Sequence, residues 1–438
     1  MASAAADQQG PIQALYFDGR KDKTFTGKST TRKEEHVAVV AEPDSRYLTH
    51  FTPETGRAIH QAKQLSDIAT DNGADIRVLG CDGTAVNTGR DGGICRLFEL
   101  SQDPPRPVHW FVCQLHANEL LLRAAFHFLD GSTTGPKSFS GPLGRAASGE
   151  VHQLGVATFR AVPGPLPDLP DQLVAELSSD QQLLYRLARG VHGGKLLDDS
   201  DAHRQIGPIN HARWLTLATR LLRVYIGSPS PTAELTELVE FLMGHYIPMW
   251  FHIRANSTCT SGALNVMRSI ELMRHLPGRL QDIIRPVMQR NAYWVHPEAV
   301  LLAMVADPDA AVRTRAVELI RRCRQQPQED VRPFKLPVIN FAATHYTELL
   351  DWEKELVTEP PLTANLTDSE LQDICDQPLQ VAAFPVHTVA VERAVKVVTE
   401  AAAAVVGEER RHGWICSRLE HRRQLPNISS KHTLVRSA

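Results

Sequence analysis

The stretch IRVLGCD, residues 76–82, is a short apolar run that ends in the carboxylate of Asp82. The stretch ALYFD, residues 14–18, ends in the same way at Asp18. Short apolar runs bounded by turn-forming residues are typical of buried β-strands, so both acids are expected at strand ends. A third acid, Glu392, lies in the segment FPVHTVAVER near the other end of the chain.

Asp18, Asp82 and Glu392 together predict a divalent-metal site. Carboxylates that converge repel one another unless a cation is bound, and Mg²⁺ prefers hard oxygen ligands. Two such ions about 4 Å apart can activate an attacking oxygen and stabilise a leaving one. The alternative from the residues alone is that Asp18 and Asp82 are turn formers, because each precedes a glycine. Glu392 would then be an ordinary surface glutamate.

The first 130 residues alternate between strand and helix patterns. Strands are expected at residues 12–17, 36–41, 47–51, 76–81 and 108–112, and helices at residues 55–72, 89–100 and 116–129. Short connections between the first three strands predict an antiparallel meander. Each later strand follows a helix, and such crossovers imply parallel pairing. The sequence therefore predicts an α/β fold with a mixed five-stranded sheet, in which the strands of Asp18 and Asp82 are neighbours.

The middle of the chain has the pattern of a helical domain. Residues 131–160 are rich in Gly, Ser, Thr and Pro and are expected to form loops. Helices are expected at residues 171–191, 211–225, 232–243, 261–275, 280–289, 297–306, 310–323 and 369–375. Residues 325–365 are Pro-rich and are expected to be irregular. A mostly helical segment therefore separates the two parts of the chain that carry the acids.

Two further motifs are candidates for function. Cys113 and His116 form a C-x-x-H pair, which could supply two of the four ligands of a zinc ion. The alternative is a buried strand cysteine followed by a hydrogen-bonded histidine at a helix start. Arg213 and Trp214 open an expected helix. Trp214 is suited either to stacking on an exposed nucleic-acid base or to packing in the core, and core packing is the commoner role.

Composition limits the class of protein. The chain has 438 residues, enough for about two or three domains, and its 42% of hydrophobic residues argues against wholesale disorder. A net charge of −3 argues against coating of nucleic acid by bulk charge. No run of about 18 apolar residues is present, so no membrane segment is expected. Scattered cysteines and the lack of a secretory signal predict a nuclear or cytoplasmic protein that is not secreted.

Four blocks of the sequence resemble blocks of hAT-superfamily transposases. They are residues 78–89 around Asp82, residues 113–120 with the C-x-x-H pair, residues 212–216 with the Arg-Trp pair, and residues 385–393, which end in Glu392 and Arg393. Their order along the chain is that of the family. The resemblance implies an RNase H-like domain, with a DDE-type catalytic core, that is interrupted by a large, mostly α-helical insertion domain.

The resemblance also implies domain boundaries. The expected parts are a tail at residues 1–11, the first part of the RNase H-like core at 12–135, the insertion domain at 136–365, the C-terminal part of the core at 366–425 and a tail at 426–438. Family transposases usually carry a zinc-finger DNA-binding domain before the first strand, whereas about a dozen residues precede that strand here. This departure favours a truncated or domesticated copy.

Each quoted residue has a role that the resemblance implies. Asp18, Asp82 and Glu392 would be catalytic and would hold two Mg²⁺ or Mn²⁺ ions, Cys113 and His116 would arrange the active site, and Trp214, Arg213 and Arg393 would bind DNA. The implied reaction is metal-dependent cleavage of a DNA strand, followed by strand transfer.

The partner implied by the resemblance is DNA in the form of transposon ends, and a homo-oligomer is compatible with it. Neither a membrane nor a small-molecule substrate is expected. Two alternatives remain open. A catalytically inactive, transposon-derived scaffold or protein-interaction protein would fit the missing zinc finger and the slightly acidic balance. A generic RNase H-like nuclease would explain the acids but not the C-x-x-H and Arg-Trp blocks.

Overall fold

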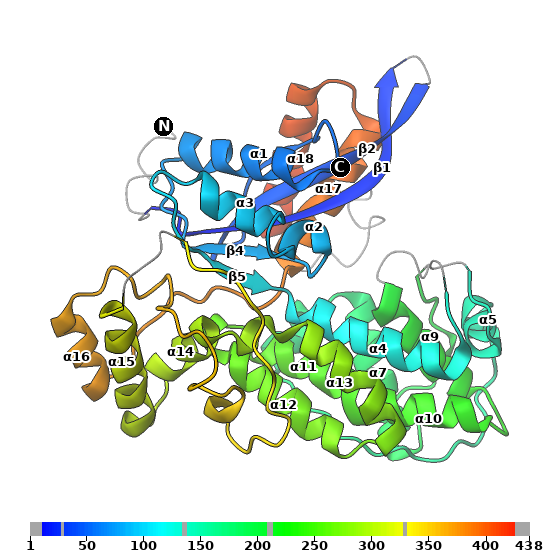
Figure 1. Cartoon of the computed structure of the whole chain (residues 1–438). Coiled ribbons are helices and arrows are strands. Elements are labelled where there is room, and N and C mark those ends of the chain that lie inside the picture. The colour runs from blue at the N-terminus through cyan, green and yellow to red at the C-terminus, as the bar shows by residue number, and fades with distance from the viewer. Residues whose placement is uncertain (1–10, 28–29, 134–137, 208–212, 327–330, 425–438) are drawn as a thin grey trace.

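The computed structural model describes residues 11–27, 30–133, 138–207, 213–326 and 331–424, and it describes side chains up to residue 419 except that of Arg213. Figure 1 shows two stacked parts, an α/β part that contains the sheet and a layer of helices beneath it. Buried hydrophobic residues of both parts form one continuous core cluster. The two parts are therefore packed as one body.

The sheet has five strands in the order β3-β2-β1-β4-β5. They are β1 (Ala14–Gly27), β2 (Thr30–Glu42), β3 (Arg46–Phe51), β4 (Val78–Cys81) and β5 (His109–Val112). β2 pairs antiparallel with both β1 and β3, while β4 pairs parallel with both β1 and β5. The predicted α/β class, the antiparallel meander and the mixed five-stranded sheet are confirmed.

The hairpin of β1 and β2 is longer than the sequence pattern predicts. The apolar pattern ends at residue 17, whereas β1 continues to Gly27, so Asp18 lies within the strand and not at its end. β4 pairs with β1 only as far as Tyr16. Beyond that point β1 pairs with β2 alone, through polar residues such as Lys21 and Glu35. Strands that face water need no apolar signal, which is why the pattern missed this extension.

Helices from both ends of the chain cover the sheet. The N-terminal ones are α1 (Ala58–Asp71), α2 (Ala85–Thr88) and α3 (Ile94–Ser101), and the C-terminal ones are α17 (Val389–Ala404) and α18 (Glu408–Gln424). α17 packs on β1 and β2. Its buried face includes Val391, Val395 and Val398, which recur at helical spacing. The last part of the chain therefore returns to the strand that carries Asp18.

The helical layer begins with α4 (Gln114–Asp130), which leaves the carboxyl end of β5 (Figure 1). The other helices are α5 (Pro142–Ser148), α6 (Asp171–Glu176), α7 (Ser179–Gly193), α8 (Ser200–His203), α9 (Arg213–Ile226), α10 (Ala233–Phe241), α11 (Ile247–Ala255), α12 (Gly262–Arg274), α13 (Gly278–Arg290), α14 (Pro297–Val305), α15 (Ala310–Arg324) and α16 (Asp368–Asp376). α4 packs against α13, α10 and α11. Within the described ranges, none of the helices has the length and apolar character needed to span a bilayer.

The structure corrects three local expectations in this layer. Residues 131–160, expected to be loop, contain α5 and a short 3₁₀ turn. The helix expected at 171–191 is broken into α6 and α7 because Ser178 and Gln181 form a reciprocal capping box at the start of α7. α11 was missed because it is apolar nearly all round, and because Pro248 suggests a break although proline is tolerated in the first turn.

A buried ion network links the two parts. Arg332 donates hydrogen bonds from Nε and Nη2 to the carboxylate of Glu298 at 2.7 and 2.9 Å, and from Nη1 to Glu99. Glu99 lies on α3 and Glu298 on α14, and all three side chains are buried. Glu99 Oε1 also accepts a hydrogen bond from Trp110 Nε1 at 3.1 Å. This Arg332 network therefore joins the sheet to the helical layer through fully paired charges.

Candidate active site

The parallel register of β1 and β4 brings Asp18 and Asp82 to the same level of the sheet. Tyr16 is paired with Gly80. Asp18 and Asp82 each lie two residues beyond this pair, and residues two apart along a strand project to the same face. The sequence prediction that their strands are neighbours is confirmed.

Glu392 approaches the two aspartates from the other end of the chain. It lies in the first turn of α17, the helix that packs on β1 and β2. Burial, followed by the carboxylates of Glu392 and Asp82, raises the pKa of Asp18 to about 8. The N–H of Gly19 and the guanidinium of Arg20 act in the opposite direction without offsetting this rise. Asp18 is therefore within the electrostatic range of both other predicted acids.

Neighbouring polar groups orient two of these carboxylates. Asp82 Oδ1 accepts hydrogen bonds from Thr84 N at 3.1 Å, Thr84 Oγ1 at 2.8 Å and Asn87 Nδ2 at 2.6 Å. Glu392 Oε1 accepts one from Thr388 Oγ1 at 2.7 Å. Over the described part of the chain, no group of three or more His, Cys, Asp or Glu side chains is assembled to hold a metal ion. The three acids therefore lie on neighbouring elements without forming a ligand set in the described residues.

The segment before α17 is fixed to the sheet by a long-range contact. Tyr16 Oη donates a hydrogen bond of 2.6 Å to the carbonyl of Pro385. The ring of Tyr16 covers Gly80, where any Cβ would overlap it. Gln114 N donates to the next carbonyl, that of Val386, at 2.9 Å. β1, β4 and α4 together therefore determine where Glu392 lies.

Cys113, the first residue of the C-x-x-H pair, lies beside Asp82 because its N–H donates to the carbonyl of Cys81 at 2.9 Å. Its Sγ accepts a hydrogen bond from His116 N at 3.4 Å and so caps α4. Burial and the nearby Glu392 carboxylate raise the pKa of Cys113 to about 12. The thiol is therefore protonated at neutral pH in the metal-free protein.

His116 faces the loop that follows Asp82. A Cβ added to Gly83 would lie 3.7 Å from His116 Cδ2 and 3.4 Å from Asn291 Oδ1. The structure therefore brings the C-x-x-H pair to the border of the acids, where Cys113 positions the helix start and His116 packs on the Asp82 loop.

Trp214 lies far from the acids. It is 5% exposed, on α9, and its ring meets those of Phe126 and His127 edge-on at 6.3 and 6.5 Å. His127 is thirteen residues after Gln114 on α4, a distance of about 20 Å at 1.5 Å per residue. Trp214 is a core residue here, as the packing alternative expects. The side chain of Arg213 lies outside the described residues.

A second polar group beside the acids was missed in the sequence. Arg254, on α11, has Nη1 2.9 Å from His387 Nε2. Burial, then Arg254 and Arg393, lower the pKa of His387 to about 3, so the imidazole is neutral. Glu392 lies within the electrostatic range of Arg254. The position of Arg254 had no sequence signal, because α11 itself was missed.

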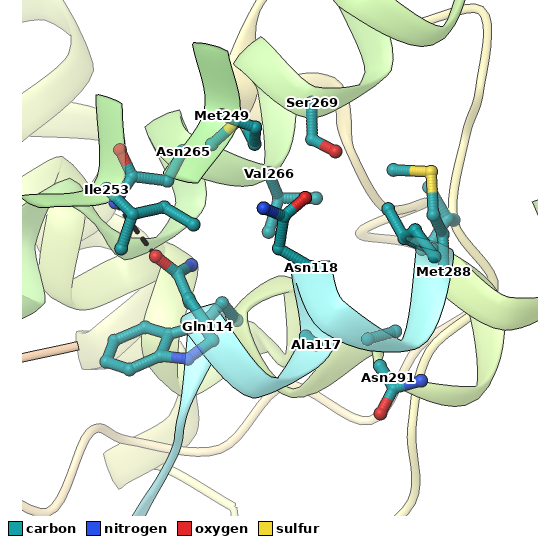
Figure 2. A pocket seen from close by; sticks show the side chains of 14 residues that line it. Gln114, Ala117, Asn118, Met249, Ile253, Asn265, Val266, Ser269, Met288 and Asn291 are labelled. Carbon is teal, nitrogen blue, oxygen red and sulfur yellow. Dashed lines mark hydrogen bonds between the residues drawn. The ribbon is translucent and has the colours of Figure 1, made fainter. Parts of the chain in front are cut away.

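A small cavity lies under the first turns of α4 (Figure 2). Its volume is about 60 Å³, and Gln114 and Asn118 of α4 face Asn265 of α12 across it. Asn265 Nδ2 donates to Gln114 Oε1 at 2.8 Å, while the Oδ1 atoms of Asn118 and Asn265 are buried without a partner. The lining includes none of the three acids, so the cavity is separate from the acidic site.

Comparisons with known protein families, with curated proteins and with solved structures found no match to this chain.

Proposed function

We propose that this protein cleaves and joins DNA strands at a divalent-metal site formed by Asp18, Asp82 and Glu392, as a member of the hAT transposase superfamily. One observation carries the proposal: Asp18 and Asp82 lie at matched positions of two neighbouring parallel strands, and α17, which carries Glu392, packs on the strand of Asp18. Uncompensated carboxylates that converge on a protein surface are the arrangement a divalent cation stabilises.

The fold supports an RNase H-like assignment. The strand and helix order β-β-β-α-β-α-β-α is the one that the resemblance implies, with α2 as one extra short helix before α3. The acids lie on the first strand, directly after the fourth strand and on a late helix. Most helices between α4 and α16 would then belong to the insertion domain.

The residues fit Mg²⁺ or Mn²⁺ in the type of atom that they offer. Carboxylate oxygens are the ligands these ions prefer, and the soft sulfur of Cys113 suits them less well. Bound divalent ions would lower the pKa of an attacking water and stabilise the leaving oxygen of a phosphodiester. Thr388 and the Thr84–Asn87 turn would orient Glu392 and Asp82 for this binding.

A second candidate function is a non-catalytic scaffold derived from a transposase. Two observations favour it. The three acids are not assembled as a ligand set in the described structure, and Trp214 lies in the core and not beside the acids. A scaffold of this kind would keep the fold and bind a protein partner without using Asp18.

Nicking of supercoiled plasmid DNA in Mn²⁺ separates these candidates. The proposal predicts nicking by the wild type and its loss in Asp18→Asn and in Glu392→Gln. Glu400→Gln is the matched control, because Glu400 lies about two turns farther along α17, and it should nick normally. Equal activity in all four proteins would indicate a contaminating nuclease and remove support for catalysis at these acids. Absence of nicking in all four would favour the scaffold.

A further inference from the structure

Basic side chains from both parts of the molecule border Glu392. Arg254 comes from the last turn of α11 in the helical layer, and His387 precedes α17. Arg393 follows Glu392 directly, and it influences both Arg254 and His387 electrostatically. A cationic group therefore lies next to the carboxylates of the proposed active site.

The contact between Arg254 and His387 leaves two donors unused. A guanidinium has no acceptor, so Arg254 Nη1 donates to His387 Nε2, at 2.9 Å. The proton of the neutral imidazole must then be on Nδ1. His387 Nδ1 and Arg254 Nε are both buried, and neither has a hydrogen-bond partner. Both side chains are only partly buried, and because a buried donor without a partner is unfavourable, each atom would gain from an acceptor that reached it.

The positive charge of Arg254 and Arg393 favours an anion as the hydrogen-bond acceptor. Arg254 is permanently charged and Arg393 adds a second guanidinium nearby. The opposing charges near Arg254 are Glu176 and Glu392, and Glu392 is assigned to the metal. An anion with oxygen acceptors could accept from Arg254 Nε or from His387 Nδ1. A phosphate group meets this description, and arginine forks bind phosphate through paired hydrogen bonds.

We propose that Arg254 and His387 bind a backbone phosphate of the DNA strand whose neighbouring phosphodiester lies at Asp18, Asp82 and Glu392. This inference rests on the proposed function, because it places the phosphate in relation to those acids. Arg254 is a positioning residue contributed by the helical layer, so the layer would fix the register of the DNA strand at the active site.

The test is binding of a fluorescent single-stranded oligonucleotide, measured by anisotropy over a range of salt concentrations. All proteins carry Asp18→Asn, which prevents cleavage and removes one of the repelling carboxylates. Adding Arg254→Ala should weaken binding about tenfold or more, the value of one charge-assisted contact. It should also reduce the slope of log K against log salt by about 0.7, because one phosphate contact is lost.

Two controls make this test specific. Arg268→Ala removes an arginine of α12 that pairs with Glu271 at 3.0 Å, and it should leave both affinity and salt slope unchanged. Arg254→Lys keeps the charge without the fork, and it should keep the salt slope while losing affinity. His387→Ala should lose affinity with little change in slope, because His387 is neutral. Thermal melting of each variant shows that it is folded.

Each outcome decides between the two proposals. If Arg254→Ala binds with wild-type affinity and slope, or if no protein binds the oligonucleotide, the phosphate site is wrong. If binding depends on Arg254 but the wild type does not nick DNA in Mn²⁺, the phosphate site stands and the catalytic proposal fails. If Arg254→Ala unfolds, Arg254→Lys and His387→Ala decide alone, and wild-type affinity in both contradicts the inference.

Discussion

The Arg332 network and the acidic site both gather carboxylates, but their charges act on the carboxyl pKa values of Glu298 and Asp18 in opposite directions. Burial alone would raise the pKa of Glu298, yet Arg332 and His296 lower it to about 2. Burial and two further carboxylates raise the pKa of Asp18 to about 8. Paired charges hold the two parts of the molecule together. The ionised form of Asp18 is destabilised in the metal-free protein, which is what a divalent cation would relieve under the proposed function.

Removal of the Arg332 guanidinium from its network should lower the free energy of unfolding more than any other change considered below. Arg332→Met leaves Glu298 buried without its arginine and leaves Glu99 with Arg96 as its cation, and the loss of a buried partner destabilises proteins by about 3–5 kcal/mol. Urea unfolding would measure the change. Arg315→Met, on the exposed face of α15, is the control and should change stability by less than about 0.5 kcal/mol. Equal stability of both variants would show that the network does not join the two parts.

A methyl group added at Gly80, between the sheet and the segment that carries Glu392, should give the next largest loss of stability. Gly80→Ala places a Cβ within the ring of Tyr16 and would push Tyr16 Oη away from Pro385. Overpacking of this kind costs about 1–3 kcal/mol. Gly92→Ala, at a glycine with open space around it, is the control and should remain close to wild type. Thermal unfolding of the two variants checks this, and a neutral Gly80→Ala would show that Tyr16 does not anchor the segment.

Neutralisation of one acid should stabilise the metal-free protein. Because the pKa of Asp18 is about 8 in the folded state and near 4 when unfolded, the folded protein binds more protons between these values. The contribution of Asp18 to the free energy of unfolding therefore falls as the pH rises from about 4 to 8. In EDTA, Asp18→Asn should be about 1–2 kcal/mol more stable than wild type at pH about 8, after allowance for solvent screening.

The pH dependence of that gain provides its own control. The difference between Asp18→Asn and wild type should become small as the pH falls to about 4 and disappear below that pH, where the carboxyl is protonated in both states. Urea unfolding at the two pH values measures it. A wild type that is more stable than the variant at pH 8 would mean that Asp18 is compensated like Glu298, and the comparison between the two clusters would fail.

Loss of the Thr388 hydroxyl, which orients Glu392, should give the smallest change in stability. Thr388→Val removes the donor to Glu392 Oε1 and keeps the side-chain shape. One hydrogen bond contributes about 1 kcal/mol to stability. We expect a stability loss of that size in EDTA, together with a several-fold weaker response to Mn²⁺. An unchanged Mn²⁺ response would show that Thr388 does not orient Glu392 for metal binding.

The sequence predicted what depends on local pattern. The apolar runs before Asp18 and Asp82 predicted both strands, and strand–helix alternation predicted their pairing. Asp18 nevertheless lies inside β1, because the polar continuation of that strand pairs only with β2. The position of Glu392 came from the family resemblance, since a single acid in a helix carries no pattern of its own.

The remainder of the site depends on contacts between distant segments. Arg254 meets His387 over 133 positions of the chain, and Tyr16 meets Pro385 over 369. No periodicity or spacing encodes such contacts. α11, which carries Arg254, is apolar nearly all round, so it lacks the one-sided pattern by which helices are recognised.

Titration with Mn²⁺, followed by thermal melting, tests the central claim most directly. A protein that binds metal only when folded gains about 2.7 kcal/mol at one hundred times the Kd. The account predicts that Mn²⁺ raises the Tm of the wild type and of Glu400→Gln, and that Asp18→Asn and Glu392→Gln both lose this rise. A wild type that melts at the same temperature with and without Mn²⁺, or four proteins that respond alike, would contradict the claim that the three acids form one metal site.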